Sequence, residues 1–337
     1  MAGWVVLVLG SGAREHALVR ALAADDAVDA VVAAPGNPGI DAIARCEPLG
    51  DVTDADAVLA IANRLAVDLV VIGPEAPLVA GVADVLRANG FLVFGPSSAA
   101  AQLEGSKSFA KEVMAAANVP TARAYVCTTP AEVEDALDDL GAPHVVKDDG
   151  LAAGKGVVVT DDLDEARAHA AACLAKPDGR VVIEEYLAGP EASVFCLTDG
   201  TTVLALSPAQ DFKRVGDGDR GPNTGGMGAY SPLDWAPADL AQDVVDRIAQ
   251  PTIDEMRHRG TPFVGALYVG LALTAKGPRV VEFNARLGDP DGQVSLAKLL
   301  TPLGTLLHAA ASRRLDEVGP LRIDPAYAVT VVVASKG

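Results

Sequence analysis

The first 95 residues alternate short apolar runs with alanine-rich segments, and this rhythm constrains the possible folds more than any other feature of the sequence. Strands are predicted at Val5–Leu9, Ala30–Ala34, Leu69–Ile72 and Leu92–Phe94. Each is followed by a turn rich in glycine, proline or small polar residues. The pattern is typical of a parallel sheet covered by helices. Residues 1–103 are therefore predicted to form a Rossmann-like α/β domain, with ligands at the carboxyl ends of its strands.

Two further units of mixed α+β character are predicted to follow. In residues 104–191 the pattern gives strands and two helices, at Ala124–Cys127, His144–Lys147, Val157–Thr160, Val181–Glu184, Pro130–Leu140 and Leu163–Ala175. In residues 192–326 it gives four strands and two long helices, at Ser193–Leu197, Thr202–Ala209, Leu267–Leu273, Arg279–Phe283, Ala238–Arg259 and Gln293–Arg313. Residues 210–230 read as a long glycine-rich loop, a feature that is usually functional in compact enzymes. Val329–Val333 reads as a buried strand.

Charge and composition narrow the classes of function. The formal net charge is −18 at pH 7, which argues against a non-specific nucleic-acid binder but not against anionic small substrates. No apolar stretch is long enough to span a membrane, and the start of the chain lacks the basic region of a signal peptide. A cytoplasmic protein is therefore predicted. The four cysteines and five histidines are scattered, which favours reduced thiols and argues against a transition-metal centre.

A glycine-rich turn follows the first predicted strand and opens a helix. Gly10 and Gly12 match the start of a dinucleotide-binding fingerprint, but Glu15 does not supply the glycine that this fingerprint requires. The free amides at the start of a helix can still hold a phosphate. From this loop alone, a phosphate site and a plain tight turn are equally favoured.

A second glycine-rich segment lies between two predicted strands, with a lysine on each side. Lys147 ends the first strand, and Lys155 stands between Gly154 and Gly156 just before the next. The spacing does not match a Walker A loop, because Gly156 occupies the place of the required serine or threonine. The arrangement resembles the lid of ATP-grasp enzymes, in which small residues let backbone amides approach phosphates closely. A hairpin turn with surface lysines is the weaker alternative.

Two strand ends carry oxygen ligands. Glu184 and Glu185 end an apolar strand, which suits an adenosine site, although paired glutamates are ordinarily a solvated strand end. Farther along, Glu282, Asn284 and Arg286 share one face of a predicted strand. The carboxylate and the amide oxygen are hard ligands suited to Mg²⁺, and the guanidinium suits a carboxylate or a phosphoryl group. A plain amphipathic edge strand is the alternative.

Together the motifs resemble the phosphoribosylamine–glycine ligase family, a branch of the ATP-grasp enzymes, over essentially the whole chain. The matching segments are Gly10–His16, Ala34–Asn37, Gly73–Leu78, Leu103–Lys107, Asp149–Gly156, Gln210–Val215, Gly221–Tyr230 and Val281–Asn284. Leu-Glu-Gly-Ser-Lys combined with Gly-Pro-Asn-Thr-Gly-Gly-Met-Gly is much more specific than any single glycine motif. The resemblance implies a two-lobed ATP-grasp domain after the first domain, with a small lobe at 104–191 and a large lobe at 192–326.

The resemblance also implies a role for each matching residue. ATP is expected at Lys107, Lys147, Gly150, Gly154, Lys155, Gly156, Glu184, Glu185, Leu187 and Glu191, and Mg²⁺ or Mn²⁺ at Glu282 and Asn284. 5-Phosphoribosylamine is expected at Gly10, Ser11, Gly12, Arg14, Asn37, Glu75, Asn223 and Thr224. Glycine and the developing phosphate are expected at Asp211, Lys213, Arg286 and Asp289.

The implied reaction joins glycine to 5-phosphoribosylamine in purine synthesis. The carboxylate of glycine attacks the γ-phosphate of ATP, and the amine of phosphoribosylamine then displaces phosphate from glycyl phosphate. The products are glycinamide ribonucleotide, ADP and phosphate. No protein nucleophile is needed, since catalysis is positioning and charge stabilisation. The expected partners of this monomeric enzyme are its small-molecule substrates, with no nucleic acid and no membrane.

The chain departs from the family pattern at several positions. Asp148 stands where a small residue is usual, and residues 287–292 differ from the usual turn. Members normally continue into a further small domain, so 327–337 is expected to begin a C-terminal domain. The chain itself is expected to bind Mg-ATP and to ligate glycine poorly. Another ATP-grasp ligase and a non-catalytic nucleotide-binding relative are the alternatives, with a dehydrogenase more distant.

Overall fold

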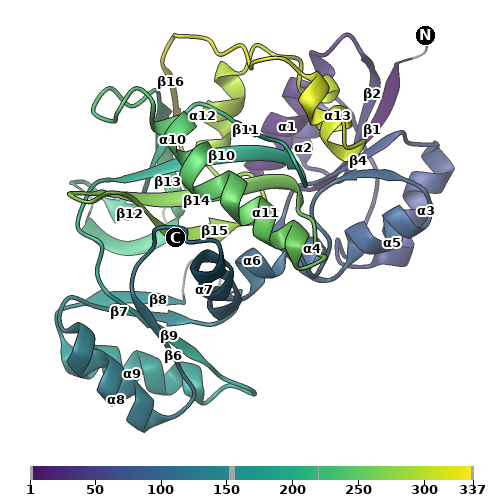
Figure 1. Ribbon diagram of the computed structural model, residues 1–337. Helices are drawn as coiled ribbons and strands as arrows, with labels where there is room; N and C mark the ends of the chain where they lie inside the picture. Colours follow the sequence, from purple (N-terminus) through teal and green to yellow (C-terminus); the bar gives the residue numbers. More distant parts are fainter. Residues whose placement is uncertain (1–2, 152–155, 219, 335–337) are drawn as a thin grey trace.

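The computed structural model describes residues 3–151, 156–218 and 220–334. Figure 1 shows three parts, with the N-terminal sheet on one side, a large lobe in the middle and a small lobe at the opposite end. Within the described residues, no helix is both long enough and apolar enough to cross a membrane.

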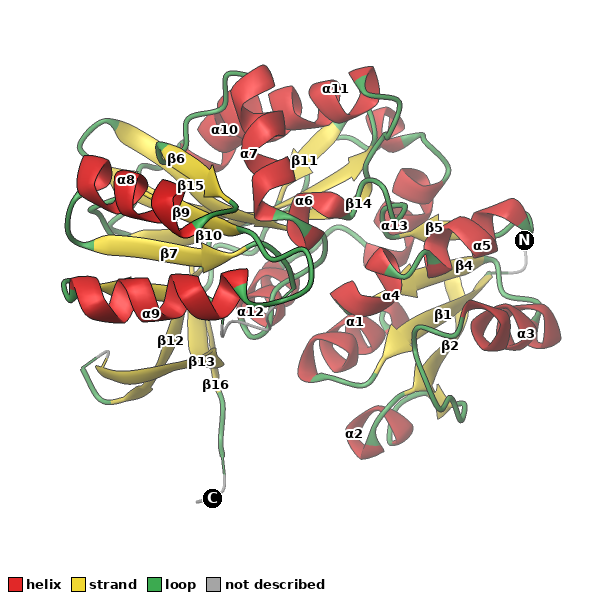
Figure 2. Cartoon of the chain, turned by 90° about the horizontal axis from the view of Figure 1, so that it is seen from below, coloured by secondary structure: helices red, strands yellow, loops and turns green. Residues whose placement is uncertain are grey.

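The N-terminal part is a five-stranded parallel sheet in the order β3-β2-β1-β4-β5. Its strands are β1 (Trp4–Gly10), β2 (Val28–Pro35), β3 (Arg45–Cys46), β4 (Leu69–Ile72) and β5 (Leu92–Phe94). Its helices are α1 (Ala13–Ala23), α2 (Pro38–Asp41), α3 (Ala55–Leu65), α4 (Glu75–Val79) and α5 (Val82–Ala88), and they lie on both sides of the sheet (Figure 2). The predicted α/β fold is confirmed, and only the two-residue strand β3 lacked a sequence signal.

The small lobe is an antiparallel sheet in the order β6-β9-β7-β8, with both of its helices on one face (Figure 2). Its strands are β6 (Ala124–Cys127), β7 (His144–Asp148), β8 (Val157–Thr160) and β9 (Val181–Glu184), and its helices are α8 (Pro130–Leu140) and α9 (Leu163–Leu174). The predicted bounds agree almost residue for residue. The two helices begin at capping side chains, Thr129 and Asp162, whose oxygens accept hydrogen bonds from the first turn. Two short helices, α6 (Gln102–Gly105) and α7 (Lys107–Ala116), connect this lobe to the N-terminal sheet.

The large lobe is built on a second antiparallel sheet, in the order β11-β10-β14-β15. Its strands are β10 (Glu191–Asp199), β11 (Val203–Ala205), β14 (Val264–Thr274) and β15 (Gly277–Asn284). Its helices are α10 (Leu240–Val244), a π turn at Val245–Ala249, α11 (Gln250–His258), α12 (Asp291–Lys298) and α13 (Leu303–Ala311), with a short 3₁₀ turn at Leu315–Glu317.

Two predicted long helices are interrupted by proline. The helix predicted over 293–313 is two helices, because Pro302 has no N–H to continue the first and instead opens α13. In the helix predicted over 238–259, Pro251 follows the π turn, which accommodates the missing hydrogen bond.

The segment predicted as a long loop is a β-hairpin, and that prediction is wrong. Strands β12 (Gln210–Gly216) and β13 (Arg220–Ser231) pair with each other, and β16 (Ala328–Val331) pairs with the other edge of β13. Because a ladder is made by main-chain groups, glycines do not prevent it once a second partner strand is present. The predicted burial of the terminal strand is also wrong, since Val329 and Val331 are 71% and 72% exposed.

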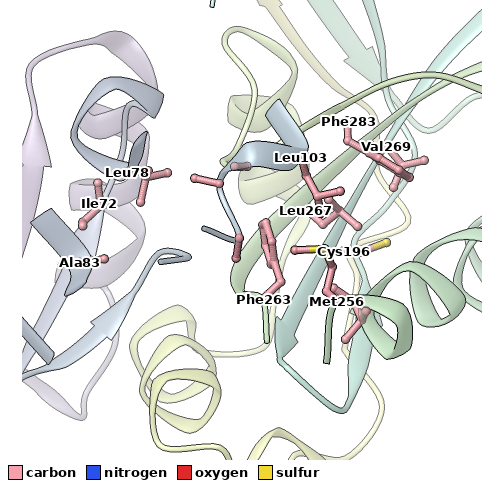
Figure 3. Packing of buried hydrophobic residues seen from close by; sticks show 14 of the residues in the cluster. Ile72, Leu78, Ala83, Leu103, Cys196, Met256, Phe263, Leu267, Val269 and Phe283 are labelled. Carbon is pink, nitrogen blue, oxygen red and sulfur yellow. The ribbon is translucent and has the colours of Figure 1, made fainter. Parts of the chain in front are cut away.

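The hydrophobic core is divided unevenly among the three parts. One cluster runs without a break from the N-terminal sheet into the large lobe, and Figure 3 shows Leu103 of α6 beside Leu267 of β14 within it. A separate cluster fills the small lobe between its sheet and its two helices. The N-terminal sheet and the large lobe therefore form one packed body, and the small lobe has its own interior.

Candidate active site

Strand β15 and the two residues after it carry the three polar side chains around which the site is built. Phe283 and Ala285 point into the core, so Glu282, Asn284 and Arg286 share the opposite face, as predicted. Opposite Glu282, strand β14 has Gly270. A β-carbon added there would lie 2.9 Å from Cε1 of Tyr268 and 3.4 Å from Cγ of Glu282. The glycine thus leaves the space in which Glu282 lies.

A β-bulge at Val281 exposes a carbonyl oxygen of the large lobe to a lysine of the small lobe. The register between β14 and β15 shifts next to Gly270, which leaves Val281 without a ladder partner. Its carbonyl oxygen accepts a hydrogen bond from Nζ of Lys147 at 2.9 Å. Nζ of Lys147 also lies 2.9 Å from Oε2 of Glu184, and Nζ of Lys111 lies 3.1 Å from Oε1 of the same carboxylate. Lys147 is thus held at the boundary between the small lobe and the metal-ligand strand.

Lys107 approaches the same region from the first residue of α7. Its Nζ donates to the carbonyl oxygen of Gly150 at 3.0 Å. Burial lowers the pKa of Lys107, and the charge of Lys147 acts in the same direction, while Glu282 opposes the change. The carboxylate of Asp149 accepts from the amide of Ser108 at 3.0 Å, which attaches the start of the glycine-rich segment to α7. Two expected nucleotide ligands, Gly154 and Lys155, lie outside the described residues.

Glu282 lies within reach of four cations. Burial by itself raises the pKa of Glu282, but Lys213, Lys147, Lys107 and Arg286 together bring the pKa below its ordinary value. The carboxylate is therefore ionised at neutral pH.

Glu282 and Asn284 suit a hard divalent cation that takes most of its ligands from a nucleotide. In the parts of the chain that the structure describes, no three His, Cys, Asp or Glu side chains gather in a way that could hold a metal ion. Mg²⁺ is commonly bound by only one or two protein oxygens together with phosphates and waters. An ionised carboxylate beside an amide oxygen fits that description.

A pocket beside Glu282 brings together residues from four strands. It is lined in part by Glu191, Ser193, Asp211, Lys213 and Tyr268. Nζ of Lys213 lies 3.6 Å from Oε2 of Glu191 and 3.8 Å from Oδ2 of Asp211. The hydroxyl of Ser193 lies 3.0 Å from that of Tyr268. The lining of the pocket thus combines a cation with carboxylates, as a site for a small zwitterion requires.

Asp291 accepts a hydrogen bond from Ser193, which lines this pocket, and it was not among the predicted site residues. It is buried in the first turn of α12, and a β-carbon added at Gly288 would lie 1.8 Å from its Oδ1. Burial, followed by the negative charge of Asp211, raises the pKa of Asp291 to about 6. The tight polar turn at 287–291 was the only signal for this carboxylate.

Arg286 is held from three directions. Its Nε lies 3.3 Å from Oε2 of Glu75, its Nη2 lies 3.2 Å from Oε1 of Glu104, and its Nη1 donates to the carbonyl of Leu287 at 3.4 Å. Burial by itself raises the pKa of Glu75, but the guanidinium of Arg286, a backbone amide and the charge of Arg14 together bring it below its ordinary value. Glu104 was not among the predicted site residues, although the motif that contains it was recognised.

The first glycine-rich loop is closed around Glu15. The carboxylate of Glu15 accepts from the amide of Gly12 at 2.6 Å and pairs with Nε of Arg14 at 2.6 Å. A β-carbon added at Gly10 would lie 2.6 Å from Cγ of Glu15, and one added at Gly73 would lie 2.2 Å from its Oε1. These glycines make room for a buried glutamate where a dinucleotide site needs free space. The dehydrogenase alternative therefore has no structural support.

The remaining predicted residues fall into two groups. Near the first loop, Asn37 caps α2 and donates to the carbonyl of Ser11 at 2.9 Å, while Oδ1 of Asp289 accepts from Gln293 at 2.6 Å. Around the other sites, Glu185 pairs with Arg279 at 3.0 Å and Thr224 donates to the carbonyl of Lys213 at 2.8 Å.

Three further predicted residues lie beside the strands of the small lobe or in the β12–β13 hairpin. Leu187 follows the end of β9 and is half-buried, and Gly156 is buried just before β8. The side chain of Asn223 lies outside the described part of the chain.

Sequence families match most of the chain. The family described as phosphoribosylglycinamide synthetase, N domain, matches residues 4–104, and the ATP-grasp (A) domain of the same synthetase matches residues 105–292. The chain is 63% identical to the phosphoribosylamine–glycine ligase of Streptomyces coelicolor, over 98% of this chain and 78% of that protein. It is 56% identical to the ligase of Mycobacterium tuberculosis strain H37Rv, over 98% of this chain and 79% of that protein.

Solved structures show the same relationship. The phosphoribosylamine–glycine ligase of Thermotoga maritima has a TM-score of 0.85 and 34% identity, and the match covers 99% of this chain and 81% of that one. The biotin carboxylase domain of the Hydrogenobacter thermophilus 2-oxoglutarate carboxylase, solved with MgADP and bicarbonate, has a TM-score of 0.75 at 16% identity. That match covers 98% of this chain and 74% of that one, and it shows the fold alone.

Proposed function

Because the chain belongs to the phosphoribosylglycinamide synthetase family, we propose that its site binds Mg-ATP, glycine and 5-phosphoribosylamine with the residues described above. The activity is the ATP-dependent ligation of glycine to 5-phosphoribosylamine in purine biosynthesis. It gives glycinamide ribonucleotide, ADP and phosphate.

One observation carries the assignment of residues. Four cations, from the small lobe, the connecting helix α7 and the large lobe, lie around one ionised carboxylate that has an amide oxygen beside it. Lys147, Lys213 and Arg286 also pair with protein carboxylates, and an anionic ligand bound at this point could contact several of the cations at once. A polyphosphate with a divalent cation satisfies both the lysines and Glu282.

We assign the nucleotide to the space between the lobes. Lys107 and Lys147 are placed to contact phosphates, since both lie near Glu282 and both approach it from the small-lobe side. On the same face of the small-lobe sheet, Val126, Val182 and Val157 form a row with Lys147. This apolar row suits the adenine base, and the ends of β9 and β10, at Glu185, Leu187 and Glu191, suit the ribose.

We assign phosphoribosylamine to the carboxyl ends of the N-terminal strands. The exposed turn at Ser11 and the carboxylate of Glu75 lie on the side that faces Arg286. Arg14 donates to the carbonyl of Leu287 at 3.2 Å, so this edge of the sheet contacts the end of the metal-ligand strand. The arrangement brings an acceptor amine close to the site of phosphoryl transfer.

The chain's own residues act by orientation and by charge. Lys213 and Arg286 would hold the carboxylate of glycine in line with the γ-phosphate and offset the charge that develops there. The carboxylate oxygen forms a bond to phosphorus as the bond to ADP breaks. The amine then forms a C–N bond as the acyl C–O bond breaks and phosphate leaves with the electron pair. Mg²⁺ or Mn²⁺ held by Glu282 and Asn284 would neutralise phosphate charge.

The proposed small-molecule substrates also suit a particular oligomeric state and compartment. A monomeric cytoplasmic enzyme that works on small molecules fits the charge of the chain and its lack of any spanning helix among the described residues. We keep both the monomeric state and the compartment as proposals.

A substrate-omission assay tests the function. Purified chain is incubated with ATP, MgCl₂, glycine and freshly prepared 5-phosphoribosylamine, and glycinamide ribonucleotide and ADP are quantified. Equal amounts of both products are expected, with neither formed when glycine or Mg²⁺ is omitted. ADP release that does not depend on glycine, or ligation of another amino acid in its place, would exclude the assignment.

A further inference from the structure

Glu104 is a buried carboxylate that the proposed reaction does not use. Its side chain is 7% exposed, in the short helix α6. Its Oε2 accepts a hydrogen bond from the amide of Ala285 at 2.7 Å, and its Oε1 lies 3.2 Å from Nη2 of Arg286. The carboxylate of Glu104 therefore holds both the main chain at Ala285 and the side chain of Arg286.

The contacts of Arg286 leave part of its guanidinium free for substrate. A guanidinium carries five N–H groups. Three of its nitrogens make one contact each, with Glu75, Glu104 and the carbonyl of Leu287. Two N–H groups therefore have no partner among residues 3–151, 156–218 and 220–334, and they can meet a carboxylate or a phosphoryl oxygen. Their direction is set by the two acids, because a planar fork that is held at two corners cannot rotate.

The position of α6 makes Glu104 a rigid support. The preceding residue, Leu103, is buried in the core that joins the N-terminal sheet to the large lobe (Figure 3). Lys107, which approaches the candidate phosphate site, begins α7 only three residues later. Glu104 and Lys107 therefore have a fixed relation to each other, one beside Arg286 and the other beside Glu282.

We infer that Glu104 is a positioning residue, which aligns Arg286 so that its free N–H groups meet the carboxylate of glycine and the transferring phosphoryl group. This inference rests on the proposed function, because it takes Arg286 as the group that contacts those oxygens. The competing explanation is that Glu104 only anchors the main chain at Ala285.

Replacing Glu104 with glutamine separates the two explanations. The glutamine oxygen can still accept from the amide of Ala285, but the side chain no longer offers a charge to Arg286. We expect E104Q to lower kcat/KM for glycine by at least about tenfold, since about 1.4 kcal/mol of lost transition-state stabilisation has that effect. The Kd of Mg-ATP, measured by calorimetry on the full chain, should change by less than about twofold.

Two further variants show whether the effect passes through Arg286. Lysine at position 286 lacks the planar fork, so E104Q combined with R286K should be less than about threefold slower than R286K alone. E104D keeps the charge but shortens the reach by one methylene. It should lower kcat by an intermediate factor while Mg-ATP affinity stays unchanged.

The control is E112Q, which removes a charge from the exposed side of neighbouring α7 and should match the wild type. The inference is overturned if E104Q and E104D both turn over like E112Q. It is also overturned if the losses from E104Q and R286K multiply, or if E104Q weakens Mg-ATP binding as much as turnover. A wild-type chain that forms no product would instead exclude the proposed function.

Discussion

The pKa of Glu282 is lowered by four cations, so a neutral substitution of this carboxylate should have a large effect on the site. Glu282→Gln removes the anionic metal ligand and leaves the lysines without their central partner. We expect turnover that depends on Mg-ATP to fall by at least about tenfold, with a higher Mg²⁺ concentration needed for half-maximal rate. The measurement is a Mg²⁺ titration of ADP release. E112Q serves as the comparison, and equal Mg²⁺ dependence in the two variants would exclude Glu282 from the metal site.

Asp291 should make stability depend on pH. Its pKa in the folded chain, about 6, is above the ordinary value of 3.8, so ionising it costs more in the folded state than in the unfolded state. Below pH 3.8 neither state carries the charge, and the full penalty, about 3 kcal/mol, is present only above pH 6.

Asp291→Asn removes that penalty while it keeps an oxygen for Ser193. Its Tm should exceed that of the wild type clearly at pH 7.5 and much less at pH 4.5. Thermal unfolding at the two pH values decides the question. A difference in Tm that is the same at both would show that the charge of Asp291 is not the cause.

Single site residues were predicted where polar side chains alternate along one strand. They were missed where the site brings together residues that are far apart in sequence. The alternation of Glu282, Asn284 and Arg286 identified one polar face. Glu104 looks like any glutamate of a helix until α6 is seen against Ala285, 181 residues away in sequence. The roles predicted for the individual site residues, those of Glu185 and Asn37 among them, stay predictions.

At the scale of single elements, the turn after β1 depends on one glutamate and the glycines around it. Gly73 follows β4 and has no left-handed backbone angle, so alanine there tests sterics alone. Its β-carbon would lie 2.2 Å from Oε1 of Glu15. We expect Gly73→Ala to destabilise the protein by about 1–3 kcal/mol. Gly50→Ala is the control, since no atom lies within 4 Å of the added carbon.

A double variant identifies the clash. In a Glu15→Ala background, Gly73→Ala should cost little further stability, because the atom that it meets is gone. Denaturant unfolding of the four proteins gives the coupling free energy. Additive losses would show that Gly73 is required for some other reason.

Elements were predicted well where one local signal fixes them. Apolar runs bounded by turns gave the strands of the parallel sheet and of the small lobe. The hairpin of β12 and β13 was missed because its glycine-rich sequence lacks an apolar alternation, although the two strands pair directly with each other. The pairing of β13 with β16, about a hundred residues later, had no local signal. The two interrupted helices had a local signal in proline, and it should have outweighed their apolar periodicity.

For the whole molecule, two separate cores predict two levels of stability. Leu103 belongs to the shared cluster, and Leu137 belongs to the small-lobe cluster. Leu103→Ala should lower the stability of the N-terminal sheet and the large lobe together, by about 2–5 kcal/mol. Leu137→Ala should affect the small lobe only.

Native-state hydrogen exchange measures both effects by region. In L137A, the amides of β6 to β9 should lose protection while those of β1 and β14 keep theirs. In L103A, β1 and β14 should lose protection by similar amounts. Loss of protection throughout the chain in L137A would mean that the small lobe is part of one cooperative unit.

The concentration of lysines and arginine around Glu282, in a chain of net charge −18, has a consequence for how fast a nucleotide arrives. At low ionic strength the repulsion of the whole acidic surface extends far from the protein, since the Debye length is about 30 Å at 0.01 M, whereas at 0.15 M this repulsion is largely screened beyond about 8 Å. Added salt therefore accelerates the first encounter and weakens the bound state. The association rate constant and the affinity for the nucleotide then have different optima of ionic strength. An acidic protein of this kind favours selectivity at the site over long-range electrostatic steering.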